Sequence, residues 1–111
     1  MIVPVRLDLI IFKDLPWDMD FDWSVNGVPF DFTLHTATLT LVNADTHAST
    51  DIATTANGRI ILSTGHVQVV LPYTATTMAL GLYEWYLKAF NSALVPLMVG
   101  SGRCSVRLGF E

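Results

Sequence analysis

The chain has 111 residues and a formal net charge of −4, and 51% of its residues are hydrophobic while only 14% are charged. This is the length of one ordinary domain, which can bury roughly two thirds of its unfolded surface but cannot form two independent cores. The six Lys and Arg residues are scattered, so no basic stripe exists to neutralise a phosphate backbone, and nucleic-acid binding is not expected. We therefore expect a single domain over residues 1–111, with apolar surface left for partners.

The hydrophobic segments do not have the form of membrane or secretion signals. The longest stretch without a charged residue, residues 60–83, contains Gly65, Pro72 and several polar residues, so it falls below the hydrophobicity of a membrane span. Residues 1–12 carry charges within their apolar segment and lack a small-residue cleavage site, which predicts folded structure. The single cysteine, Cys104, cannot form an intrachain disulfide, which fits a reducing cytoplasm, and it is predicted to be a small buried strand residue.

Alternation of apolar and polar residues predicts β-strands along the first half of the chain. Residues 3–11 alternate in this way and form the first predicted strand. Residues 20–32 are predicted to form a hairpin around an Asn-Gly pair, which favours a type I′ turn. Residues 36–41 place threonines on one face and apolar side chains on the other, which predicts a strand, and residues 43–49 are predicted to be a loop.

The second half continues the pattern with one helical interruption. Residues 59–62 and 66–71 are predicted to pair as a hairpin through a turn that contains glycine. Thr74 is positioned to cap a single helical turn over residues 75–79. Residues 82–90 carry aromatic side chains on both faces, which favours a central strand.

The last segment is predicted to contain an irregular stretch and a final strand. Pro96 lies within residues 94–99, which favours an irregular or edge segment, and Gly-Ser-Gly at residues 100–102 is interpreted as a turn. Residues 103–110 alternate again and form the last predicted strand. Seven or eight short strands separated by turn signals predict an all-β fold, an antiparallel β-sandwich with one short helical turn; a small barrel is the alternative.

The sequence DMDFD, with Asp18, Asp20 and Asp22 at alternate positions, is the feature that most resembles a metal site. Calcium-binding loops carry such residues at positions one, three and five, but position six here is Trp23 where the loop requires glycine, and position twelve is not glutamate. In a strand the three carboxylates share one face, which we interpret as solvated and unable to bind calcium. The alternatives are a weak cation site shared with Asp31 or with a neighbouring subunit, and use in an interface.

No combination of residues has the spacing of a catalytic or zinc site. His35, His47 and His66 lie in different predicted elements, without cysteine or glutamate at ligand spacing. No serine or threonine lies in a nucleophile-elbow motif, and Cys104 is predicted to point inward. We therefore expect no catalytic residue, no metal, no cofactor and no enzyme activity.

The predicted core lies between two sheets and is filled from alternate strand positions. Trp23 and Trp85 are predicted to lie on facing sheets and to share this core. The alternative interpretation of the aromatic residues is a carbohydrate platform that includes Trp17 and exposed tyrosines. The predicted core residues are Trp23, Leu39, Leu41, Tyr83, Trp85, Val106 and Leu108.

Several short motifs, taken in order, resemble a small domain that recurs in tailed bacteriophages. The segment FDWSVNGVPFDFTLHTATLTLV is followed by a polar loop, by NGRIIL, by VQVVLPYTATTMALGLYEWYL and by a final strand within GSGRCSVRLGF. The matching residues are 29–33, 36–42, 57–62, 74–77, 81–83 and 102–108. The chain is thus similar to small immunoglobulin-like structural proteins of these viruses, which include the N-terminal domain of upper baseplate proteins and tail-fibre attachment proteins.

The resemblance implies an immunoglobulin-like sandwich that acts as an assembly module, with no active site and no cofactor. The expected function is that of a structural virion protein of a tailed phage, assembled in the host cytoplasm, which joins tail, fibre, neck or head components. The expected partners are other virion proteins and copies of the chain itself, with no nucleic acid and no membrane. The alternative function is a carbohydrate-binding module that recognises a host-surface glycan, and an enzyme ranks third.

The N-terminal segment precedes the region of resemblance and is the predicted interface. Residues 1–12 form an apolar strand with Ile2 and Ile10 on its nominally outward face, and a strand that is apolar on both faces needs a partner. The segment either pairs with another subunit or pairs within its own sandwich. The predicted interface residues are Ile2, Pro4, Arg6, Asp8, Ile10, Phe12 and Trp17.

Overall fold

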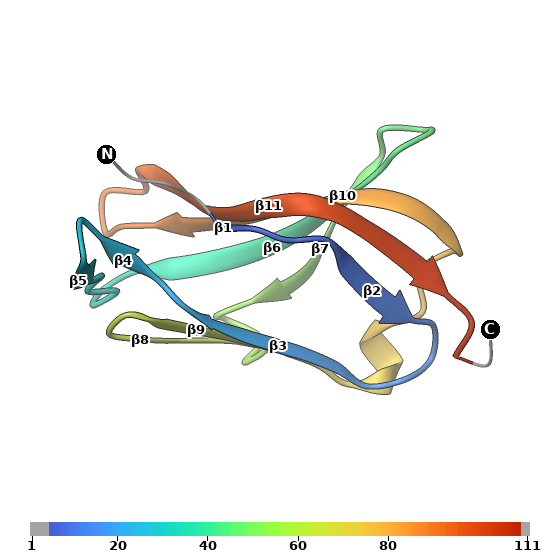
Figure 1. The fold of residues 1–111 in the computed structure, drawn as a ribbon, viewed down its shortest axis with the longest axis horizontal. Coiled ribbons are helices and arrows are strands. Elements are labelled where there is room, and N and C mark those ends of the chain that lie inside the picture. The colour runs from blue at the N-terminus through green and yellow to red at the C-terminus, as the bar shows by residue number, and fades with distance from the viewer. Residues whose placement is uncertain (1–4, 110–111) are drawn as a thin grey trace.

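The computed structural model describes residues 5–109, which form an all-β sandwich of two facing sheets (Figure 1). The larger sheet contains six strands: β1 (Val5–Arg6), β2 (Leu9–Phe12), β6 (Thr36–Asn43), β7 (Ser49–Thr54), β10 (Gly81–Phe90) and β11 (Pro96–Arg107). Their spatial order is β1, β11, β10, β6, β7, and β2 also pairs with β11. β10 is therefore a central strand, as its aromatic pattern predicts.

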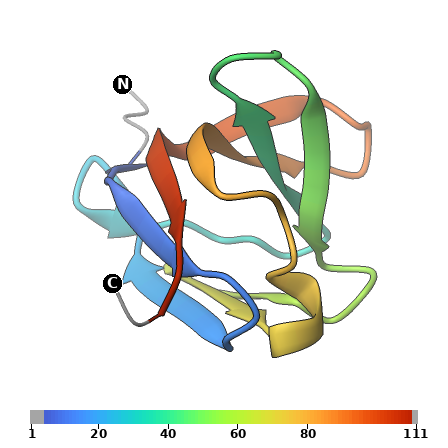
Figure 2. The same ribbon diagram turned by 90° about the vertical axis from the view of Figure 1, so that its right-hand side faces the viewer.

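The smaller sheet contains three strands: β3 (Trp17–Asp22), β9 (His66–Leu71) and β8 (Ile60–Ser63), in that spatial order. Figure 2, which views the molecule from one end, shows this sheet facing the larger one. A separate ribbon of β4 (Ser24–Val25) and β5 (Val28–Pro29) forms the predicted hairpin. Its turn residues Asn26 and Gly27 have φ of 54° and 80°, the positive values that a type I′ turn requires.

The strand arrangement is that of an immunoglobulin-like sandwich. β6, β10 and β11 lie side by side as the C, F and G strands of that fold do, and β3, β9 and β8 take the places of B, E and D. At the start of β10 the Tyr83 hydroxyl donates a 2.7 Å hydrogen bond to the carbonyl oxygen of Ala79. This bond is the tyrosine corner of immunoglobulin-like domains, and it fixes the connection that enters the strand.

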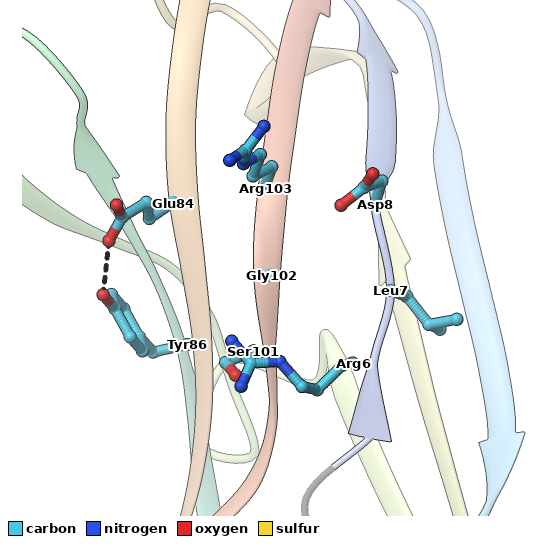
Figure 3. Close-up of a pocket in the computed structure, with 8 residues that line it drawn as sticks. All are labelled: Arg6, Leu7, Asp8, Glu84, Tyr86, Ser101, Gly102 and Arg103. Carbon is cyan, nitrogen blue, oxygen red and sulfur yellow. Dashed lines mark hydrogen bonds between the residues drawn. The ribbon is translucent and has the colours of Figure 1, made fainter.

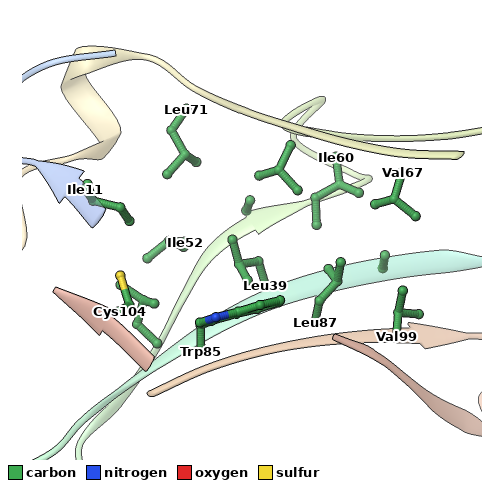
Figure 4. Close-up of a cluster of buried hydrophobic side chains, with 14 of the residues drawn as sticks. Ile11, Leu39, Ile52, Ile60, Val67, Leu71, Trp85, Leu87, Val99 and Cys104 are labelled. Atoms are coloured by element: carbon green, nitrogen blue, oxygen red, sulfur yellow. The ribbon is translucent and has the colours of Figure 1, made fainter. Parts of the chain in front are cut away.

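The core lies between the sheets and is built from the inward positions of the strands (Figure 4). Trp85, Leu39 and Leu87 of the larger sheet belong to one buried cluster with Ile60 and Val67 of the smaller sheet. Leu108 is only half-buried and lies outside this cluster, because β11 and its alternation end at Arg107, so its assignment to the core is wrong. The other predicted core residues are all buried: Trp23, Leu39, Leu41, Tyr83, Trp85 and Val106.

More strands are present than the seven or eight predicted. The first predicted strand is divided at Leu7 and Asp8 into β1 and β2, and both pair with β11 in parallel, so the sandwich is not purely antiparallel. β7 was not predicted at all. Its sequence, STDIAT, exposes three polar residues and then buries two adjacent ones, and its pairing with β6 is irregular after Leu39, so it lacks a period of two.

β11 is one continuous strand across residues 100–102, so the turn predicted there is wrong. The irregularity predicted before it is present as a shift in the β10–β11 register between Leu87 and Lys88. Pro96 is tolerated because it is the first residue of the strand. A Cβ on Gly100 would lie 2.7 Å from the Trp85 ring, and one on Gly102 would lie 1.9 Å from the carbonyl oxygen of Leu7. These glycines therefore permit close approach of the indole ring and the N-terminal segment, and they do not form a turn.

The helical turn lies earlier than predicted. The 3-10 helix η1 covers Tyr73–Ala75 and has no side-chain cap, so Thr74 lies inside it and does not cap a turn over residues 75–79. The buried Thr76 hydroxyl donates a 2.7 Å hydrogen bond to the carbonyl oxygen of Leu15. This contact ties the connection after η1 to the turn between β2 and β3.

Candidate interaction surfaces

The acidic run of β3 forms one exposed face, as its alternation predicts. Asp18, Asp20 and Asp22 are exposed, while the residues between them are half-buried. His66 on the neighbouring strand β9 lies 2.8 Å from Asp22 and 4.0 Å from Asp20. Among residues 5–109 no group of three or more His, Cys, Asp or Glu side chains has the arrangement of a metal site.

Cys104 lies on the inner face of β11, as predicted, and has no access to solvent. Its burial raises the pKa of the thiol to about 12. The thiol therefore stays protonated at neutral pH and lacks the thiolate character of a reactive cysteine.

The aromatic residues proposed for a carbohydrate platform are not brought together. Trp17 is half-buried and packs against the core, and Tyr83 is buried at the tyrosine corner. Tyr73 is exposed on η1, whereas Tyr86 is half-buried on the outward side of β10 in the larger sheet. Trp17 thus contributes to packing within the chain, and the tyrosines lie on separate surfaces.

The predicted N-terminal interface pairs within its own sandwich over the part that the structure describes. β1 and β2 form backbone pairs with β11, yet the side chains of Arg6, Asp8, Ile10 and Phe12 remain exposed. Ile2 and Pro4 lie outside the described residues. The segment therefore completes the larger sheet and leaves its outward side chains available for contacts.

Two loops that carry exposed apolar residues lie at one end of the sandwich, at the left of Figure 1. Phe90, the last residue of β10, pairs with both Thr36 and Pro96, so the segment before β6 lies beside the turn between β10 and β11. Leu34 lies in the first of these loops and Leu94 in the second. We define the loop end as the exposed apolar residues of these two loops: Leu34, Leu94 and Val95.

Two leucines of the loop end adopt a costly backbone conformation. Leu34 and Leu94 have φ of 63° and 61°, in the left-handed region that disfavours residues with a Cβ. They are also the most exposed large hydrophobic side chains among the described residues, at 79% and 75%. Neither the strain nor the exposure benefits the isolated domain, and such features concentrate at functional surfaces.

Hydrogen bonds within the loops hold this arrangement in place. The Asn91 side-chain oxygen accepts hydrogen bonds from the backbone N–H groups of Ala93 and Val95 at 2.9 and 3.1 Å. In the other loop the Asp31 carboxylate accepts hydrogen bonds from the hydroxyl and the backbone N–H of Thr33, and these bonds lower the pKa of Asp31. The leucines are therefore presented by structured loops.

A second surface is the outward side of the larger sheet, where a hollow of about 550 Å³ lies over β1, β11 and β10 (Figure 3). Its charged residues are Arg6, Asp8, Glu84 and Arg103. Within the described part of the chain, ion pairs involve only His66 with Asp20 and Asp22, so none of these four charges is paired. The Tyr86 hydroxyl donates a hydrogen bond to Glu84, which raises the pKa of Tyr86.

A smaller hollow of about 360 Å³ lies at the opposite end, between β6, β7 and the connection from η1 to β10. Leu41, Ile52, Met78 and Tyr83 line its apolar part, and threonines line the remainder. Tyr83 and Ala79 of the tyrosine corner line this hollow, so we interpret it as the open end of the core between the two sheets.

Sequence reasoning missed both the loop end and the hollow. Leu34 follows Thr33 and Leu94 follows a turn that begins at Asn91, and an apolar residue next to turn-forming residues is the signal that could have identified them. The proximity of Glu84 and Arg103 could not be predicted, because the sequence predicts a turn within β11 and does not assign the pairing of β11 with β10.

No protein-family model matches the sequence, and no curated protein is significantly similar to it. No helix within residues 5–109 is long and apolar enough to cross a bilayer.

Proposed function

We propose that this protein is a structural assembly module of a tailed-phage virion, an adaptor that docks onto another virion protein through the loop end. The observation that carries the proposal is the pair of strained and highly exposed leucines, Leu34 and Leu94, at one end of a rigid sandwich. The resemblance of the sequence motifs to small phage structural domains supports the virion as the setting.

The physical argument is that apolar loop tips gain free energy only when another surface covers them. Burying a leucine side chain contributes about 1.5–3 kcal/mol. Two leucines and Val95 together could therefore form the buried centre of a protein–protein contact. A rigid scaffold with pre-ordered loops loses little conformational entropy on binding. The partner should therefore present an apolar pocket with a polar rim.

The test replaces both leucines with asparagine, which tolerates the left-handed conformation and removes the apolar surface. We expect the double variant Leu34→Asn/Leu94→Asn to unfold at the same or a slightly higher denaturant concentration than the wild type, and to be lost from purified particles. Ile61→Asn is the matched control, because Ile61 is 51% exposed but lies on β8 away from the loop end. Wild-type incorporation of the double variant would refute docking through this end.

Carbohydrate binding is the second candidate, and the hollow beside Tyr86 is the observation that favours it, since guanidinium and carboxylate groups bind sugar hydroxyls. It ranks lower because a single tyrosine lines the hollow and its hydroxyl is already bonded to Glu84. A glycan array probed with the wild type and with Tyr86→Ala tests this candidate. Binding that depends on Tyr86 would support it.

A further inference from the structure

The hollow on the larger sheet contains charges of both signs at adjacent positions. Glu84 on β10 and Arg103 on β11 are direct neighbours in the antiparallel register, and Arg6 pairs with Ser101 on the other side of β11. The side chains of Arg6, Asp8, Glu84 and Arg103 are all exposed on this outward side (Figure 3). The pattern therefore alternates in sign across neighbouring strands.

Glu84 and Arg103 form no ion pair with each other, although opposite charges directly across an antiparallel strand pair normally attract. The Glu84 carboxylate accepts its hydrogen bond from Tyr86, and no ion pair within residues 5–109 includes Arg103. An arginine in this state keeps its planar set of N–H donors available for a carboxylate of another molecule. The hollow is therefore complementary to a surface that also carries both charges.

An apolar row lies beside the charged hollow. Ser105 of β11 pairs with Ile10 of β2 on one side and with Leu82 of β10 on the other. Ile10 is 44% exposed and Leu82 is 66% exposed, and the small serine between them leaves room for a side chain from outside. A charged region next to exposed apolar side chains has the composition of a protein–protein contact.

We propose that the outward face of the larger sheet binds a second copy of this chain, related by a twofold axis that lies in the plane of contact and runs along the strands between β10 and β11. Such an axis between Glu84 and Arg103 brings Arg103 of each copy onto Glu84 of the other. A face of one sign would repel its copy, whereas this face is complementary to itself. The same operation places Leu82 of each copy over Ser105 of the other, so the two apolar rows meet on one side of the charged centre.

The dimensions of the sheet are sufficient for this contact. Five strand positions at about 4.8 Å and ten residues of β10 at about 3.3 Å give a face of about 24 by 33 Å. This product is an upper bound of roughly 800 Å² per copy, so only full use of the face reaches the size of a standard specific interface. The pairing uses no residue of the loop end, so it is independent of the proposed function.

Sedimentation equilibrium over a concentration series tests the pairing by charge reversal. We expect a wild-type dimer that weakens with added salt, and at least about tenfold weaker self-association for Arg103→Glu and for Glu84→Arg, because each places like charges opposite each other twice. Mixing the two single variants restores dimers, since each contact then joins opposite charges. The double variant Arg103→Glu/Glu84→Arg also dimerises. Asp18→Arg on β3, an exposed reversal on the other sheet, leaves the dimer unchanged.

Three results would overturn the proposal. They are a wild type that stays monomeric throughout the series, single reversals that associate like the wild type, and a mixture that fails to restore the dimer. Melting curves of each variant verify folding, and the neutral pair Arg103→Gln and Glu84→Gln weakens the dimer without creating repulsion. Saccharide binding in the hollow by a wild type that remains monomeric would likewise assign the face to a different ligand.

Discussion

The two faces of β10 share one backbone but have opposite chemistry. Tyr83, Trp85 and Leu87 point inward and are buried, whereas Glu84 and Lys88 point outward and are exposed. The side chains of the inner face are closely packed between the sheets, so a change in the size or shape of one side chain disturbs the packing of its neighbours. On the outer face the side chains have solvent around them, so the sequence there is free to serve contacts with other molecules.

The closest packing on the inner face surrounds the Trp85 ring. Gly100 and Gly102 of β11 allow the indole to lie against the strand, and its Nε1–H donates a 2.8 Å hydrogen bond to the carbonyl oxygen of Leu7. This bond joins the core to the segment between β1 and β2. On the outer face the charged side chains of the described residues form no ion pair with one another.

The largest expected effect on the inner face comes from Trp85→Ala. Removing the fully buried ring leaves a cavity and frees the Leu7 carbonyl, which should lower the free energy of unfolding by about 3–5 kcal/mol. Urea denaturation followed by circular dichroism measures this loss. Glu84→Ala, one residue away on the outer face, is the matched control and should change stability by less than about 0.5 kcal/mol. Similar losses of unfolding free energy for both variants would contradict the difference between the two faces.

Gly102→Ala should follow, with a loss of about 3 kcal/mol, because the new Cβ would lie 1.9 Å from a backbone oxygen that cannot move without displacing β1. Hydrogen exchange should show faster exchange of the Leu7 amide, which bonds to the Ser101 carbonyl oxygen. Ser101→Ala is the control, since its half-exposed side chain lies on the outward side. An unchanged exchange rate at Leu7 would contradict the role assigned to this glycine.

Cys104 should make stability fall at alkaline pH. The thiol ionises above its ordinary pKa of 9.0 in the unfolded chain, but burial holds the folded pKa at about 12, so unfolding releases a proton between these values and stability declines as pH rises. The maximum slope is about 1.4 kcal/mol per pH unit. The stability difference between the wild type and Cys104→Ala should therefore narrow by about 2 kcal/mol between pH 8 and pH 10.5. Parallel stability curves would show that the thiol is not protected by burial.

The smallest effect concerns the two tyrosine hydroxyls of β10. Tyr83→Phe removes the hydrogen bond to Ala79 and should cost about 1 kcal/mol. Tyr86→Phe removes the exposed bond to Glu84 on the outer face and should cost less than about 0.5 kcal/mol. Thermal melts of the two variants compare the inner and outer hydroxyls. Equal decreases in melting temperature would argue against a structural role for the tyrosine corner.

The sequence predicted the elements in which one face is buried, because burial imposes a period of two. β6, β9 and β10 follow this rule, and so does the exposed acidic face of β3. The rule fails at β7, which buries Ile52 and Ala53 at adjacent positions. It also fails at residues 100–102, where the glycines permit close approach of the Trp85 ring and of the Leu7 carbonyl oxygen. The pairing of β7 and the contacts of these glycines depend on residues far away in the sequence, and the local alternation of apolar and polar residues carries no information about them.

The candidate surfaces were harder to predict for the same reason. The outward exposure of Arg6, Asp8, Ile10 and Phe12 follows from local alternation and could be expected. The juxtaposition of Glu84 with Arg103 depends on the β10–β11 register, and the strain of Leu34 and Leu94 depends on loop geometry. Neither can be derived from composition or spacing.

We infer that the inner face of the larger sheet determines folding, and we propose that its outer face determines self-association. The most direct measurement takes Glu84→Arg and the milder core variant Trp85→Phe, and determines the free energy of unfolding and the dimer dissociation constant of each. We expect Glu84→Arg to weaken dimerisation at least about tenfold while changing the free energy of unfolding by less than about 0.5 kcal/mol. We expect Trp85→Phe to lower the free energy of unfolding by about 1–3 kcal/mol without changing dimerisation of the folded protein. If either variant changed both quantities together, the separation of the two faces would be contradicted.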